Sequence, residues 1–455
     1  MRLELLRSFF GTAERCSAKR VRSVTRLTAL AVILLPLLVH TAHADDSAHG
    51  GLITPVLAAL FILLLAGKIG GDLVLRAGQP AVLGELLIGL VLGNLGLLGI
   101  TYFDGLKHDS IVTVLAELGV ILLLFEVGLE TSVPEMLKVG WSSLLVAILG
   151  VVAPFLLGWL VAAYFLPEAN ILVHIFVGAT LTATSVGITA RVLKDLGKTK
   201  TKEAKIILGA AVIDDVLGLL VLAVVTSTVH SANAGTKLDT FGILKIVFLA
   251  LGFLALAIGV GRALTPRYFK LATYLKSHGV LLASTLSLCF GLSYLAGLCG
   301  LAPIVGAFTA GLILEPVQYK DLALKEGKAT VDELIHPITQ IFAPIFFILM
   351  GARVELWAFA DTSVLGFAAV LTLAAIIGKQ LCSLGVREPG VDRVVVGLSM
   401  IPRGEVGLIF AGIGLTLMLD GERVIDSATF GAVVIMVIVT TMVTPPLIKW
   451  RFGKS

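Results

Sequence analysis

The sequence has few charged residues and few cysteines. Of its 455 residues only 15% are charged and 57% are hydrophobic, with a mean hydropathy of +1.00. Soluble domains carry about 25% charged residues, so this composition excludes an ordinary soluble protein. The four cysteines, Cys16, Cys289, Cys299 and Cys382, show no paired or metal-ligand spacing. A disulfide framework and a zinc site are therefore not expected.

Two functional signatures are also missing. No Gly-x-x-x-x-Gly-Lys-Ser/Thr loop is present, so ATP-driven pumping is not expected and no cofactor is predicted. The formal net charge is +4, but seven of the 35 basic residues lie in the first 44 positions. The basic excess therefore belongs to a leader, and nothing favours a nucleic-acid partner.

That leader, residues 1–44, has the plan of a cleaved signal peptide. A basic region is followed by an apolar core, Leu27 to Val39, and by Ala42-His43-Ala44 before two aspartates. Cleavage would place the new N-terminus outside the cytoplasm. A retained short first span is the alternative. Residues 45–455 are then expected to form one transmembrane exchanger domain without a cytoplasmic regulatory domain, since the apolar runs are joined by short loops.

The apolar runs predict an all-α, polytopic membrane protein with about thirteen transmembrane helices, taking about 20 apolar residues per crossing. The segments are 52–75, 80–100, 110–128, 137–165, 170–193, 204–228, 241–264, 276–298, 301–317, 334–352, 363–385, 392–418 and 427–449. An odd number of crossings from outside places the C-terminus in the cytoplasm. The loops that this assigns to the inside hold about fourfold more basic residues than those outside, as the positive-inside rule requires. We expect a multi-pass protein of the cell (inner) membrane.

The two halves of the chain show weak internal similarity. Residues 122–130 of the third segment resemble residues 346–355 of the tenth. Because the tenth segment follows the third at an offset of seven segments, which is odd, the two would run in opposite directions, as in inverted-topology repeats of six segments, a linker and six more. Chance similarity between Leu- and Phe-rich helices is the alternative.

This pairing aligns the fifth segment with the twelfth, and both are interrupted. The fifth carries Thr182, Thr184 and Ser185 among glycines, and the twelfth carries Pro402-Arg403-Gly404-Glu405. Unwound backbone at membrane depth is tolerated where it lines a protein-enclosed site, so paired broken helices indicate a transport site. In the fifth segment alone, small and hydroxyl residues are equally typical of ordinary helix packing.

Asp214 and Asp215 lie in the middle of the membrane-length apolar run 206–225. A charge at the centre of a spanning helix costs about 2.5–3.5 kcal/mol, so two adjacent acids indicate a site for a proton or a small cation. Neighbouring side chains point in different directions on a helix, and each acid can meet a different partner. The alternative is that buried bases neutralise both acids and only hold helices together.

Three other charged residues lie deep in apolar segments. Lys379 is expected to pair with Asp214 or Asp215, or else to extend to the membrane interface. Arg403 and Glu405 would neutralise each other or the helix ends created by the break in the twelfth segment.

Taken together, these motifs resemble the monovalent cation:proton antiporter-2 family, especially its sodium/proton exchangers with two adjacent aspartates. The matching stretches are 79–93, 122–130, 182–187, 211–218, 300–314, 344–351, 378–379 and 402–408. The resemblance implies an NhaA/NapA-like antiporter fold, a dimerisation domain beside a mobile core with two crossed broken helices, an elevator-type movement and a homodimer.

By the same resemblance, Asp215 is the ion-binding acid, Asp214 its neighbour, and Lys379 the base that pairs with Asp214 when no cation is bound. Na⁺ would bind at Asp214 and Asp215, and Thr184 and Ser185 would lend oxygen atoms. The resemblance implies electrogenic Na⁺/H⁺ exchange. The alternatives are K⁺/H⁺ or Li⁺ exchange, a sodium-coupled solute symporter, and a channel or sensor derived from the fold.

Overall fold

The structure is a computed structural model that describes residues 53–99, 103, 105, 107, 109–130, 140–185, 188–189, 192–193, 196–198, 200–233, 240–326, 330–356, 362–419 and 421–452. The expected signal peptide, residues 1–44, lies outside this part. So does the side chain of Glu405.

The described part is almost entirely helical. Its α-helices are α2 (Ile53–Arg76), α3 (Ala81–Gly93), α5 (Ser110–Glu130), α7 (Trp141–Phe165), α8 (Ile171–Thr180), α10 (Lys202–Asn233), α11 (Thr240–Ala272), α12 (Val280–Leu298), α13 (Pro303–Ile313), α14 (Pro316–Glu326), α15 (Val331–Ala352), α16 (Thr362–Leu381), α17 (Arg393–Ser399), α18 (Glu405–Thr416) and α19 (Ser427–Phe452). Two 3-10 helices, η1 (Leu95–Leu98) and η3 (Cys382–Gly385), and a hairpin of β1 (Met418–Leu419) with β2 (Glu422–Arg423) complete the described elements.

Nine of the described helices are long and apolar enough to cross a membrane, and four shorter apolar helices accompany them. The chain is therefore an integral, multi-pass membrane protein. Two of the segments expected to span the membrane, 80–100 and 301–317, contain only short helices. Helix α3 has 13 residues and α13 has 11. The apolar runs of the sequence do not predict helix α14, because its polar and charged residues are typical of a loop rather than of a membrane span.

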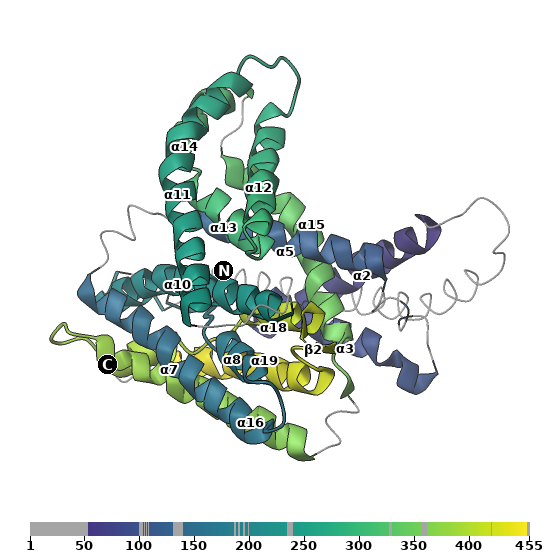
Figure 1. Cartoon of the computed structure of the whole chain (residues 1–455), viewed down its shortest axis with the longest axis vertical. Helices are drawn as coiled ribbons and strands as arrows, with labels where there is room; N and C mark the ends of the chain where they lie inside the picture. Colours follow the sequence, from purple (N-terminus) through teal and green to yellow (C-terminus); the bar gives the residue numbers. More distant parts are fainter. Residues whose placement is uncertain are drawn as a thin grey trace, which may run out of the picture.

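The helices form two bundles that are visible in Figure 1. One contains α2, α3, α5, α12, α13 and α15, and the other contains α7, α8, α10, α16, α17, α18 and α19. We call the bundle that contains α2 the first bundle and the one that contains α10 the second bundle. Helix α11 packs against α10 of the second bundle and against α12 and α13 of the first bundle. The adjacent aspartates lie on α10, in the second bundle.

The same helix contacts recur in the two halves of the chain. Helix α2 packs on α3 as α12 packs on α13, and α3 packs on α15 as α13 packs on α5. Glycines let the backbones meet at these crossings. A Cβ atom would strike a carbonyl of the facing helix in four equivalent places: Gly89 at Ile348, Gly351 at Leu86, Gly311 at Phe125 and Gly128 at Phe308. The similar stretches 122–130 and 346–355 thus make equivalent contacts.

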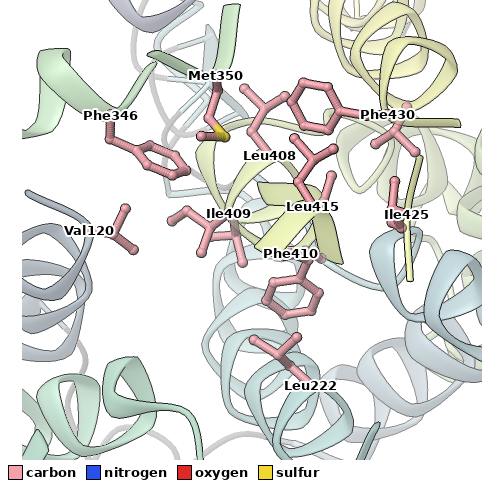
Figure 2. Close-up of a cluster of buried hydrophobic side chains, with 14 of the residues drawn as sticks. Val120, Leu222, Phe346, Met350, Leu408, Ile409, Phe410, Leu415, Ile425 and Phe430 are labelled. Carbon is pink, nitrogen blue, oxygen red and sulfur yellow. The ribbon is translucent and has the colours of Figure 1, made fainter. Parts of the chain in front are cut away.

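Apolar side chains fill the boundary between the two bundles. Figure 2 shows Val120 of α5 and Phe346 and Met350 of α15 pointing toward Ile409 of α18. Gly412 of α18 leaves room there, since a Cβ atom at this position would lie 2.8 Å from the Met350 sulfur. This part of the contact between the bundles is apolar, whereas elsewhere along the boundary the Ser227 hydroxyl of α10 donates to the Gly300 carbonyl, between α12 and α13, over 2.6 Å.

Candidate functional site

Helix α10 brings the two aspartates to the centre of the second bundle. Asp214 is fully buried and Asp215 is half-buried. One turn beyond Asp214, on the same face of α10, Gly218 lies against the broken segment that follows α8, where a Cβ atom would be 3.8 Å from the Thr182 hydroxyl. This places the interrupted backbone beside the aspartates.

Lys379 of α16 forms an ion pair with Asp214. Its Nζ atom lies 2.8 Å from Asp214 Oδ1, and both side chains are 0% exposed. Burying one charge alone would cost several kcal/mol, so each group keeps the other charged in this apolar region. The structure thus selects Asp214 from the two candidate partners and places Lys379 inside the bundle rather than at its surface.

Gly150 of α7 makes room for this ion pair. A Cβ atom at Gly150 would lie 3.5 Å from Lys379 Nζ and 3.6 Å from Asp214 Oδ1, which is ordinary van der Waals contact. A side chain longer than alanine would have to enter the space that the pair occupies. No sequence pattern indicates this role, because Gly150 lies 64 positions from Asp214 in an ordinary apolar run.

The two interrupted segments touch each other. Helix α8 ends at Thr180, and α17 and α18 are separated by the non-helical residues 400–404. The Ser185 backbone N–H donates to the Pro402 carbonyl over 2.8 Å, and the Thr189 hydroxyl donates to the Ser399 carbonyl over 2.6 Å. Each break therefore satisfies part of the other's exposed backbone.

Arg403 holds this crossing from within the protein. It is 0% exposed, and its guanidinium donates to the carbonyls of Ala183, in the other break, and of Ala375, on the lysine-bearing α16. The Thr441 hydroxyl of α19 donates in turn to the Arg403 carbonyl. The Arg403 guanidinium therefore satisfies a backbone carbonyl, that of Ala183, in the break that follows α8. An Arg403–Glu405 contact is not described, since the Glu405 side chain lies outside the described part.

Some oxygen atoms in this region have no hydrogen-bond partner within the described chain. They include Asp214 Oδ2, Thr184 Oγ1 and Ser399 Oγ, all buried. Unpaired buried oxygens are rare in folded proteins and mark sites for water or an ion. Carboxylate and hydroxyl oxygens suit a hard cation. Within the described residues no group of three or more His, Cys, Asp or Glu side chains could hold a metal ion, so any cation here would also need hydroxyl, backbone or water oxygens.

Comparison with known proteins decides the family. Residues 56–450 match the family described as "Sodium/hydrogen exchanger, transmembrane". The chain belongs to the sodium/hydrogen exchanger family. It is accordingly a transporter of the cation/proton antiporter class rather than an enzyme.

Two relatives of this exchanger align along most of their length. The high-affinity Na⁺/H⁺ antiporter NhaS3 of Synechocystis is 36% identical, with 92% of this chain and 94% of the relative covered. The Na⁺/H⁺-K⁺ antiporter GerN of Bacillus cereus is 35% identical, with 86% of this chain and 95% of the relative covered. The structure of the sodium proton antiporter MjNhaP1 from Methanocaldococcus jannaschii has a TM-score of 0.64 at 17% identity, covering 88% of this chain and 97% of that one. This last similarity supports the fold.

Proposed function

We propose that this exchanger is a secondary active antiporter that exchanges Na⁺ for protons at Asp214 and Asp215. The observation that carries the proposal is the buried Lys379–Asp214 ion pair at the crossing of two interrupted helices, beside a second acid on the same helix. The names of the two relatives, both of which include Na⁺/H⁺ exchange, support Na⁺ as the cation.

The chemistry follows from competition for the same oxygens. A cation that binds Asp214 Oδ2 competes with the Lys379 ammonium for the charge of that carboxylate, and a lysine left in an apolar bundle without a carboxylate to neutralise it is driven to release its proton. Asp215, which is half-buried, must also be deprotonated to bind the cation. Each cation bound would thus release two protons, one from Lys379 and one from Asp215. Exchange in that ratio is electrogenic.

Alternating access requires the site to face each side of the membrane in turn. The described residues of the site lie in the second bundle, and the part of its boundary with the first bundle shown in Figure 2 is apolar. We propose that the second bundle moves against the first, in an elevator-type movement, and carries the ion with it. A homodimer, with the N-terminus outside after signal cleavage and the C-terminus in the cytoplasm, completes the proposal.

K⁺/H⁺ exchange is the second candidate. The name of GerN, a Na⁺/H⁺-K⁺ antiporter, favours K⁺ as an additional substrate. The two cations differ in size and in the geometry of the oxygens they prefer, so selectivity has to be measured.

The test is exchange in liposomes that hold the purified protein and a pH gradient. We expect dissipation of the gradient on addition of Na⁺, and its loss in the Asp215→Asn variant. Parallel additions of Li⁺ and K⁺ measure selectivity, and a valinomycin-clamped membrane potential tests electrogenicity. Glu333→Gln, at an exposed position on α15, is a matched carboxylate control that should exchange as the wild type does. If no cation moves protons, or Asp215→Asn works as well as the wild type, the proposal is wrong.

A further inference from the structure

The first bundle encloses a cavity that the exchange site does not use. Its volume is about 590 Å³, and it is walled by α2, α3, α5 and α15. Residues of the second bundle do not line it. Lining residues such as Asp72 and Gln340 are exposed, so the cavity opens at one end.

Three of the four walls are joined by a chain of polar contacts. Lys68 of α2 donates to the Gln340 carbonyl over 3.3 Å, and the Gln340 side chain meets His336 Nε2 at 2.7 Å. His336, on the same helix α15, pairs through Nδ1 with Glu126 of α5. These side chains therefore already have partners.

The fourth wall, α3, contributes a carboxylate that has no hydrogen-bond or ion-pair partner in the described part of the chain. Glu85 of α3 is 7% exposed and lines the cavity, and it makes no hydrogen bond or ion pair with the part of the chain that the structure describes. Only the charge of Lys68 acts on it at longer range. A buried carboxylate without a partner is costly in a membrane, so it needs either a proton or a cation.

The charges around the cavity favour a cation as the occupant. The described lining carries the acids Asp72, Glu85, Glu126 and Glu130 and the bases Lys68 and His336. Arg76 neutralises Asp72 over 2.7 Å. The described carboxylates of the lining thus outnumber its bases, which favours a cation, and the volume admits a cation with several waters, since a water takes about 30 Å³.

We infer that this cavity is a second cation site, separate from the Asp214–Asp215 site, in which a partly hydrated monovalent cation of the Na⁺ class binds to Glu85. Helix α3 would transmit its occupancy. The opposite side of α3, at Leu83 and Leu86, faces Gly404 of the helix crossing across a second, narrow cavity. A cation bound on one side of α3 would therefore act on the same helix whose other side faces the broken segment at Gly404.

The experiment measures Na⁺ binding in a protein that lacks the proposed transport site. Full-length Asp214→Asn/Asp215→Asn/Lys379→Met protein, in which Lys379 is not left buried without its carboxylate, is unfolded thermally in detergent, in NaCl or in choline chloride of equal ionic strength. Because a ligand that binds only the folded state raises Tm, we expect Na⁺ to raise it by about 1–3 °C at concentrations above its Kd. Adding Glu85→Gln should abolish the rise, whereas adding Glu333→Gln should preserve it.

Labelling by a hydrophobic carbodiimide provides a measurement that needs no further variant. In the same triple variant, mass spectrometry should show several-fold slower modification of Glu85 in NaCl than in choline chloride. Equal rates, a Tm that follows pH but not Na⁺, or a Na⁺ effect that survives Glu85→Gln would each overturn the inference. Because the triple variant lacks Asp214 and Asp215, these outcomes are independent of whether exchange occurs at those aspartates.

Discussion

Removing one partner of the Lys379–Asp214 pair should destabilise the exchanger far more than removing both. The two side chains are 0% exposed and their charged atoms lie 2.8 Å apart. Losing one partner of such a pair costs about 3–5 kcal/mol, because the remaining charge stays buried and uncompensated, whereas replacing both by neutral groups is often close to neutral.

Arg403 makes the two single variants unequal. It is the other buried base that interacts electrostatically with Asp214. In Lys379→Met, Arg403 still offers Asp214 a positive charge, so we expect a cost near the lower limit, about 3 kcal/mol. In Asp214→Asn, two buried bases remain without that carboxylate, and the cost should approach about 5 kcal/mol.

The assay is a double-mutant cycle measured by thermal unfolding in detergent at one pH. The double variant Asp214→Asn/Lys379→Met should be more stable than Asp214→Asn alone. The half-buried pair of Arg262 and Glu315 provides a matched control, in which we expect a coupling energy below about 1 kcal/mol. If the two single costs at Asp214 and Lys379 add within about 0.5 kcal/mol, the pair is not coupled and the reasoning fails.

Three further predictions concern the same site. Gly150→Ala should leave Tm and exchange nearly unchanged, whereas Gly150→Leu should lower both, because only the longer side chain displaces Lys379 and Asp214; thermal unfolding and liposome exchange measure this. Gly404→Ala should cost about 1–3 kcal/mol, because its Cβ atom would lie 2.6 Å from Ser185 Cβ, and adding Ser185→Gly should recover much of the loss in Tm; no recovery would contradict the contact. The apparent KM for Na⁺ should rise about a hundredfold for each unit by which the pH falls in the range in which Lys379 and Asp215 are both protonated before Na⁺ binds, because each Na⁺ displaces two protons; exchange assays at different pH measure this, and a KM independent of pH would exclude the competition.

Much of the architecture follows from the sequence because membranes impose simple rules. Apolar runs of spanning length locate helices, and the limits expected for the sixth and thirteenth segments, 204–228 and 427–449, lie within α10 and α19. The doubled acid at Asp214 and Asp215 and the Pro402-Arg403-Gly404-Glu405 break are recognisable for the same reason. Charges and prolines in an apolar run are too costly to be there without a role.

Which residues meet was decided only by the tertiary structure. The sequence left Asp214 and Asp215 as equal partners for Lys379, because neighbouring helical positions point in different directions and the choice depends on how α16 is packed beside α10. It also gave no means of seeing that the Ser185 amide reaches the Pro402 carbonyl.

Glu85 shows the same limit in the first bundle. In the sequence Glu85 is one of several glutamates in or near apolar segments, and nothing in its neighbours along the chain distinguishes a buried carboxylate from a surface one. Only the packing of α2, α3, α5 and α15 around it reveals a buried carboxylate facing a cavity. Hydropathy identifies what enters the membrane, because transfer from water depends on each segment's own composition. Contacts between segments depend on distances across the fold, which composition does not contain.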